Sequence, residues 1–166
     1  MSTILKNWLV APLALCLALP AASKPVAQAP PTRREIQVIY NQINAAAMQK
    51  NVDGVYDFNS DDYTVIDIKG HVHEASEWRQ EFEQALEIVD SIKAISIIQS
   101  FAGTDTEATV TVKEHTVAHV ANNANGRAVT LTADDVAREH WLKTADGWRR
   151  TRTRILSGKN AFQKNF

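Results

Sequence analysis

Four arginines fall within six positions near the C-terminus, in the stretch GWRRTRTRIL at residues 147–156. An arginine guanidinium can bind a carboxylate or a phosphate through two parallel hydrogen bonds, so this run is a candidate anion site. The whole chain, however, carries 18 Lys and Arg against 19 Asp and Glu. Nucleic-acid-binding domains usually carry a basic excess, because contacts to phosphates supply most of their affinity. We therefore expect no nucleic-acid partner.

Glu114 is a candidate general acid or base. In the strand predicted over residues 108–120, Ala108, Val110 and Val112 alternate, which places Glu114 on the same, inner face. A carboxylate that faces an apolar cavity has a raised pKa and can exchange a proton with a ligand. The alternative is a solvated or arginine-paired Glu114 at the mouth of the cavity.

Asp67 is the second candidate carboxylate. It is in phase with Tyr63 and Val65 on a strand predicted over residues 62–68, which would direct it inward. It could equally lie in the turn and cap the backbone of Lys69 and Gly70.

The histidines do not form a metal set. His115 and His119 are expected to point outward, and on a strand they lie about 13 Å apart, too far for one ion. The sequence also contains no recognisable nucleophile arrangement and no cofactor-binding loop. We expect neither a metal nor a cofactor.

These candidates need helices and strands to position them. Helical spacing of apolar residues predicts helices over 33–50, N-capped by Thr32, and over 76–89, with a short helix within 51–59. Tyr40 and Trp78 lie on the apolar faces of the two longer helices, as core aromatics or as pocket residues. Alternation then predicts strands over 62–68, 92–101, 108–120, 127–144 (bulged near Asp134 and Asp135) and 148–156. Helices followed by a long antiparallel run indicate an α+β domain.

The turn Asp146–Gly147 predicts a hairpin that fixes how the arginines face. With these two residues as the loop, Trp141 lies opposite Arg152, and Glu139 lies opposite Arg154. Arg152 could then stack on Trp141 and Arg154 could pair with Glu139, as a solvated stripe of charges. Alternatively, Arg152 or Arg154 reaches a cavity and binds a carboxylate or a phosphate.

The N-terminal residues predict an export signal. Lys6 precedes the apolar run at residues 8–19, and Ser23 ends a stretch of small residues suited to cleavage. Cleavage there would remove Cys16, the single cysteine, and release a secreted or periplasmic protein without stable membrane insertion. We expect residues 1–23 to be the signal, 24–32 a proline-rich tether, 33–158 one domain and 159–166 a tail.

Three stretches resemble the NTF2-like superfamily, and most closely its SnoaL-like and DUF4440-type exported bacterial domains. They are DDYTVIDIKGHVH (61–73), GTDTEATVTV (103–112) and HWLKTADGW (140–148). The resemblance implies a cone, in which a curved antiparallel sheet wraps a cavity closed by helices, and often a homodimer through the outer sheet face. It also makes the Asp67 position a frequent cavity residue.

Three functions agree with this fold, because the superfamily holds enzymes, binding proteins and adaptors. The first is binding of a small molecule, anionic if the arginines reach it, by Tyr40, Tyr63, Trp78, Glu139, Trp141, Arg152 and Arg154. The second is a cofactor-free isomerase, dehydratase or hydrolase with Asp67 or Glu114 as the base and Tyr63 or Tyr40 as donor. The third is a protein-binding adaptor, which would have a filled cavity and an apolar outer face.

Overall fold

A computed structural model describes residues 31–120 and 129–164 of the chain, and the predicted signal at residues 1–23 lies outside them. The order of elements is α1 (Pro31–Met48), α2 (Val52–Tyr56), β1 (Asn59–Ile66), β2 (Val72–Glu74), α3 (Ala75–Glu87), β3 (Ser91–Gly103), β4 (Glu107–Val120), β5 (Val129–Thr144) and β6 (Gly147–Lys164). Helices come first and long strands follow, as the sequence predicts.

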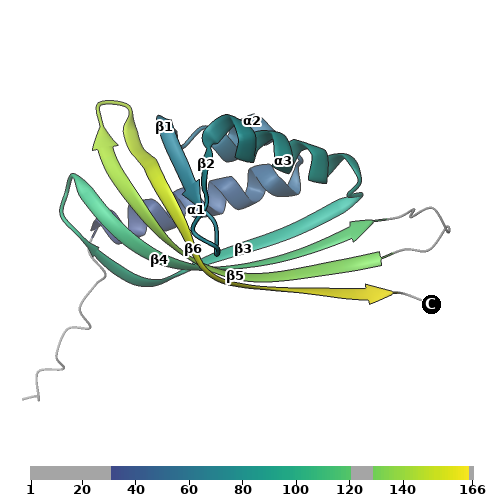
Figure 1. Cartoon of the computed structure of the whole chain (residues 1–166). Helices are drawn as coiled ribbons and strands as arrows, with labels where there is room; N and C mark the ends of the chain where they lie inside the picture. Colours follow the sequence, from purple (N-terminus) through teal and green to yellow (C-terminus); the bar gives the residue numbers. More distant parts are fainter. Residues whose placement is uncertain (1–30, 121–128, 165–166) are drawn as a thin grey trace, which may run out of the picture.

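One strongly curved sheet carries the three helices on its concave side (Figure 1). Its six strands lie in the order β2-β1-β6-β5-β4-β3. All neighbouring strands are antiparallel except β1 and β6, which are parallel. The sheet is thus antiparallel, as expected, except at this one pair; the strand β2 and the helix α3 separate β1 from the run β3–β6.

Local signals explain where the helices begin. Asn51 caps α2, and its side-chain oxygen accepts a hydrogen bond from Gly54 N at 3.1 Å. Glu74 and Glu77 form a capping box at the start of α3. The first helix begins at Pro31, so Thr32 lies within its first turn and is not the N-cap that we expected. Proline is well tolerated at that position.

The β5–β6 hairpin differs from the predicted register. Thr144 pairs with Gly147, so the two-residue loop is Ala145–Asp146. Gly147, with φ of 108°, takes its left-handed conformation as the first residue of β6. Two further shifts lie on β6, where Thr151 and Leu156 are extra residues without partners on β5. Asp134 and Asp135 lie on β5 and pair without interruption with His115 and Glu114 of β4. The bulge expected at these two residues was therefore wrong.

The last strand is also longer than predicted. It runs to Lys164, and its final residues pair with the start of β5 at Val129. Residues 159–164 therefore form part of the sheet, where the sequence suggested a tail. Within the described ranges, no helix is long and apolar enough to span a membrane.

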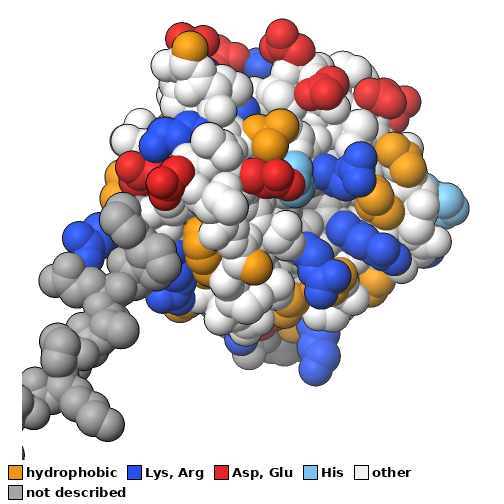
Figure 2. Space-filling model, turned by 90° about the vertical axis from the view of Figure 1, so that its left-hand side faces the viewer, with side chains coloured by type: hydrophobic (Ala, Val, Ile, Leu, Met, Phe, Trp, Pro, Cys, Tyr) orange, Lys and Arg blue, Asp and Glu red, His pale blue; other side chains and the backbone are white. Residues whose placement is uncertain are grey.

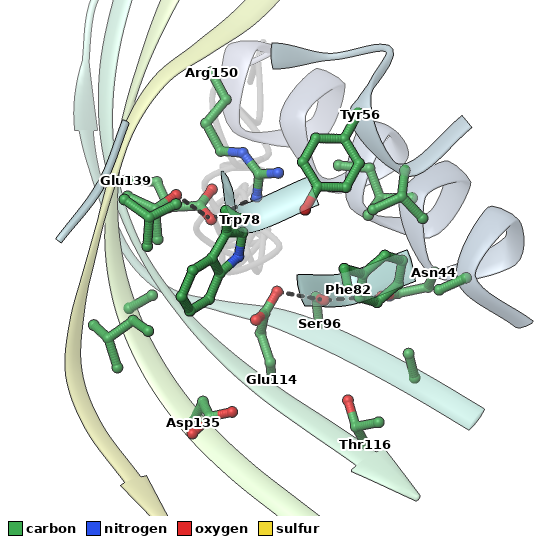
Figure 3. A pocket seen from close by; sticks show the side chains of 18 of the residues that line it. Asn44, Tyr56, Trp78, Phe82, Ser96, Glu114, Thr116, Asp135, Glu139 and Arg150 are labelled. Atoms are coloured by element: carbon green, nitrogen blue, oxygen red, sulfur yellow. Dashed lines mark hydrogen bonds and ion pairs between the residues drawn. The ribbon is translucent and has the colours of Figure 1, made fainter. Parts of the chain in front are cut away.

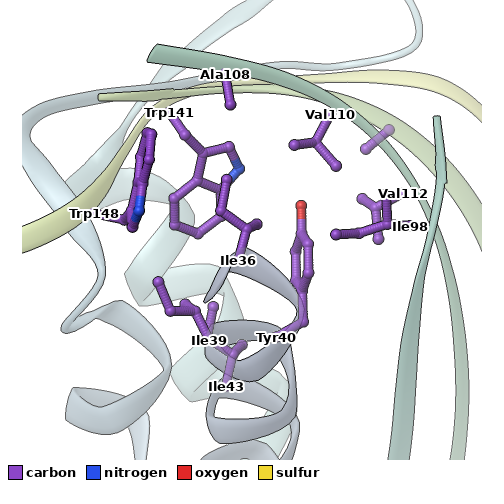
Figure 4. Close-up of a cluster of buried hydrophobic side chains, with 11 residues drawn as sticks. Ile36, Ile39, Tyr40, Ile43, Ile98, Ala108, Val110, Val112, Trp141 and Trp148 are labelled. Atoms are coloured by element: carbon purple, nitrogen blue, oxygen red, sulfur yellow. The ribbon is translucent and has the colours of Figure 1, made fainter. Parts of the chain in front are cut away.

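The hydrophobic core lies between α1 and the concave face of the sheet (Figure 4). Its buried members come from α1, from the inward positions of β3, β4 and β5, and from the start of β6. They are Ile36, Ile39, Tyr40, Ile43, Ile98, Ala108, Val110, Val112, Ala137, Trp141 and Trp148. This cluster fills one end of the cone and fixes α1 over the sheet.

Replacing Ile36 by alanine should lower the free energy of unfolding by about 2–5 kcal/mol, because its side chain is fully buried in this core. Val38 lies on the same helix but is 50% exposed, so Val38→Ala should change stability by less than about 0.5 kcal/mol. Urea unfolding of both variants measures the difference. Equal losses would contradict the packing of α1 described above.

Candidate functional site

Beyond the packed core, the interior of the cone is hollow. A cavity of about 300 Å³ lies between the three helices and the concave face of the sheet (Figure 3). Its walls are largely apolar and aromatic, with Tyr56, Tyr63, Trp78 and Phe82 among them. Its polar lining consists of Asn44, Ser96, Glu114, Thr116, Asp135, Glu139, Arg150 and Thr153. Apolar walls with a few convergent polar groups are typical of small-molecule sites.

Glu139 and Arg150 form a buried ion pair at one end of this cavity. Arg150 Nη1 donates to Glu139 Oε1 at 2.8 Å, and the glutamate is only 1% exposed. Two buried charges are tolerated when each is paired and when hydrogen bonds satisfy the remaining atoms. Further contacts reach both members of the pair.

On the carboxylate side, three further donors reach Glu139. Tyr40 Oη donates to Oε2 at 2.6 Å, Trp141 Nε1 donates to Oε2 at 3.1 Å, and Thr153 Oγ1 donates to Oε1 at 3.3 Å. Burial and the neighbouring Glu139 carboxylate raise the pKa of Tyr40, so this phenol keeps its proton and remains a donor. The carboxylate therefore links α1, β5 and β6.

On the arginine side, two aromatic rings and an amide complete the environment. The guanidinium carbon lies 5.0 Å from the centre of the Tyr63 ring and 5.8 Å from that of Trp141. Arg150 Nε donates to Asn59 Oδ1 at 3.0 Å. Stacking on aromatic rings stabilises a desolvated guanidinium. Arg150 thus ties β6 to β1.

Glu114 lies on the cavity side of β4, where the alternation placed it. Its side chain is partly buried, and Oε1 accepts a hydrogen bond from Ser96 Oγ at 3.3 Å. Ser96 Oγ also lies 3.0 Å from Asn44 Oδ1 on α1. Burial, followed by repulsion from Glu139, raises the pKa of Glu114 to about 7. Near neutral pH this carboxyl can therefore either give or accept a proton.

Asp67 lies in the turn after β1, and it does not line the cavity. Its Oδ1 accepts hydrogen bonds from Lys69 N and His71 N, each at 2.8 Å. Desolvation acts to raise the pKa of Asp67, but these hydrogen bonds outweigh it and hold the pKa at about 2. The inward orientation was wrong, because β1 ends at Ile66 and the strand alternation stops there. The turn-capping alternative is the one observed.

Arg152 and Arg154 lie on the outer face of the sheet, away from the cavity. The extra residue Thr151 reverses the alternation, so Arg150 points inward while Arg152 pairs with His140 and Arg154 pairs with Arg138. Both side chains are exposed. The predicted contacts of Arg152 with Trp141 and of Arg154 with Glu139 were therefore wrong. Arg150 makes both contacts.

The outer arginines lie in a mixed environment. A shallow groove on the outer face is lined by Arg138, His140, Arg152 and Arg154, but also by Asp62 and Leu142. In the face that Figure 2 shows, Lys and Arg side chains are interspersed with hydrophobic, acidic and other side chains. The groove itself thus combines basic, acidic and apolar side chains.

The remaining predicted site residues divide into two groups. Tyr63, Trp78 and Glu139 line the cavity, and Tyr40 and Trp141 are fully buried behind it in the core. Arg150 was not predicted as a cavity residue; it alternates with the buried Trp148, and the bulge at Thr151 separates it from the outward Arg152. Tyr56, Ser96 and Asn44 were not predicted either. Ser96 alternates with Ile98 toward the core, and that pattern was the one available signal.

Removing Arg150 should be costly, because it leaves Glu139 buried without its counter-charge. We expect Arg150→Met to lower the free energy of unfolding by about 3–5 kcal/mol. The matched change Arg152→Met, two residues along the same strand but exposed, should cost less than about 0.5 kcal/mol. Chemical unfolding of both proteins measures this. Similar losses would mean that the two arginines do not face opposite sides of the sheet.

The raised pKa of Glu114 predicts how stability depends on pH. Between pH 4.5, its ordinary pKa, and about 7, the folded protein holds a proton that the unfolded chain has released. The free energy of unfolding should therefore fall as pH rises through this window. In Glu114→Gln, which carries no charge at any pH, this part of the fall should be absent. Urea unfolding across the window, with the exposed Glu87→Gln as control, tests it; parallel profiles for all three proteins would contradict it.

No protein-family model matches this sequence, and no curated protein matches it. Several solved structures, however, have a fold similar to that of this chain. A conserved protein from Planctomyces limnophilus has a TM-score of 0.64 at 14% identity, covering 81% of this chain and 98% of its own. A proposed scytalone dehydratase from Novosphingobium aromaticivorans has a TM-score of 0.63 at 9% sequence identity, and the match covers 81% of this chain and 88% of that one. A hexachlorocyclohexane dehydrochlorinase, LinA Type2, has a TM-score of 0.59 at 9% sequence identity, and the match covers 81% of this chain and 89% of that one. Likeness at such identities concerns the fold alone: the chain has the α+β, NTF2-like cone.

Proposed function

We propose that this protein binds a small molecule in the cavity of its cone. The observation that carries the proposal is the cavity itself, about 300 Å³ of space walled by aromatic rings and lined by Glu114, Ser96 and Arg150. A domain that used only its surface would be expected to fill this interior with side chains, because protein cores are close-packed. The adaptor alternative is therefore the less favoured one.

The ligand need not be anionic. An anionic ligand was expected only if Arg152 or Arg154 reached the cavity, and both arginines lie outside it. Arg150 does line the cavity, but its charge is matched by Glu139 at 2.8 Å. We infer that Arg150 acts mainly as a hydrogen-bond donor that orients a polar group of the ligand.

A second candidate function is proton-transfer catalysis with Glu114 as the general base. Figure 3 shows the Glu114 carboxylate, the Tyr56 hydroxyl and the Arg150 guanidinium around the same space. A base with a pKa of about 7 opposite hydrogen-bond donors suits isomerisation or elimination at neutral pH. Two of the similar structures, a dehydrochlorinase and a proposed dehydratase, are described as catalysts of eliminations. Asp67 is not a candidate base here, because it lies in the β1–β2 turn.

We also propose export and dimerisation. Export depends on the predicted signal at residues 1–23, which would place the domain in the periplasm or outside the cell. A homodimer would use the outer face of the sheet, where Ile95 and Ile97 are 55% and 59% exposed on β3. The cavity lies between the helices and the concave face of the sheet, so neither proposal depends on it.

Filling the cavity should abolish binding. Ala94 lines the cavity on β3, whereas Ala102 on the same strand is exposed and does not. Native mass spectrometry of protein purified from the cells that make it should detect a retained molecule in the wild type and in Ala102→Phe, but not in Ala94→Phe. A molecule that survives in Ala94→Phe would lie elsewhere. No retained molecule in any of the three would count against tight binding.

The same measurement on Glu114→Gln separates the two candidate functions. In a binding protein, any molecule that the variant retains, at equal or lower occupancy, would be the wild-type molecule. An enzyme that has lost its base would instead retain its unconverted substrate, which differs from the wild-type molecule in mass or, for an isomer, in chromatographic retention.

A further inference from the structure

A second, apolar cavity lies next to the one already described. It occupies about 270 Å³ between the C-terminal half of α3 and the distal parts of β4 and β5. Its lining includes Leu86, Ile88 and Val89 on the helix side and Ala118, Leu131 and Ala133 on the sheet side. Among the described residues that line it, none is charged. We call this second space the apolar groove.

The apolar groove is continuous with the first cavity, which holds Glu114 and Arg150 and is called the polar cavity below. Phe82, Ile92 and Thr116 line both of them. In Figure 3, Thr116 and Asp135 lie at one end of the polar cavity, Arg150 and Glu139 lie at the other, and Glu114 lies between them. The two spaces therefore form one path that runs from the buried ion pair, past Glu114, to the apolar groove along α3.

The polar part of this path carries unmatched negative charge. Arg150 is paired with Glu139. Glu114 and Asp135 also line the cavity, and neither forms an ion pair with a described residue. The lone donor to Glu114 in the described part of the chain is the neutral Ser96. Burial, and then repulsion from Glu139, disfavour the ionised form of Glu114, so a positive group placed beside this carboxylate would stabilise it.

We propose that the ligand is a single amphipathic molecule whose apolar chain lies in the groove along α3 and whose amine head group binds between Glu114 and Asp135. This proposal rests on the small-molecule function proposed above and names its ligand class. An apolar chain gains free energy from each CH₂ group it buries in the groove. An ammonium head group supplies the positive charge and the N–H donors that the two carboxylates lack.

Matched straight-chain probes test the head group. Decylamine, decanol and decanoate share one chain and differ in charge. At a pH near 8, where Glu114 is ionised, decylamine should bind at least about tenfold more tightly than decanoate, with decanol between them. Isothermal titration calorimetry on the mature protein measures the three dissociation constants. Decanoate binding as tightly as decylamine, or no binding of decylamine, would overturn the proposal.

Two variants test the two ends of the path. Ala133→Phe fills the apolar groove and should weaken decylamine binding about tenfold or more, while hexylamine, whose chain is shorter, should lose less. Val136→Phe, on the outward-facing side of the same strand, is the matched control and should leave both constants unchanged. Glu114→Gln should reduce the preference of the site for decylamine over decanol. Thermal unfolding of each variant checks that it is folded.

The outcomes separate this inference from the proposed function. If hexylamine binds as tightly as decylamine, and Ala133→Phe weakens neither, the polar cavity binds ligand but the groove takes no part, so the inference alone fails. If no probe binds and the purified protein retains no molecule, the proposed function fails with it.

Discussion

The ion pair between Glu139 and Arg150 is the interaction on which the rest of this structure depends. Its carboxylate accepts hydrogen bonds from α1, β5 and β6, and its guanidinium reaches β1 through Asn59. Two charges in a protein interior are costly unless every polar atom is satisfied, so these contacts fix the four elements in one arrangement. The pair closes the inner end of the cone and separates the packed core from the cavity.

The same pair determines the chemistry of the cavity. Burial of Glu114 and repulsion from the Glu139 carboxylate together outweigh the attraction of Arg150, so the pKa of Glu114 rises to about 7. The cavity therefore contains a donor whose charge is already matched and carboxylates whose charge is not. A neutral or positively charged group fits this environment better than the anion that the run of arginines first suggested.

Strand alternation and helical periodicity, which are local signals, were sufficient to predict an α+β domain, the order of its elements and the inward orientation of Glu114. The cone was implied by the resemblance of three stretches to NTF2-like domains. The local signals were insufficient for the arginines. The loop Ala145–Asp146 shifts the hairpin by two residues, which places Arg150 opposite Trp141 on the inner face, and the extra residue Thr151 then turns Arg152 outward. A bulge has no reliable local signature, and one extra residue exchanges the two faces of a strand. Asp67 was misplaced for a related reason, because alternation does not continue past the end of β1.

A crystal structure of the protein, purified from the cells that make it, would test this account most directly. We predict the Arg150 guanidinium paired with Glu139 inside the cone, Arg152 on the outer face, and elongated density running from Glu114 toward Phe82 and the helix α3. Arg152 in the cavity in place of Arg150, or a cavity closed by repacked side chains, would contradict it.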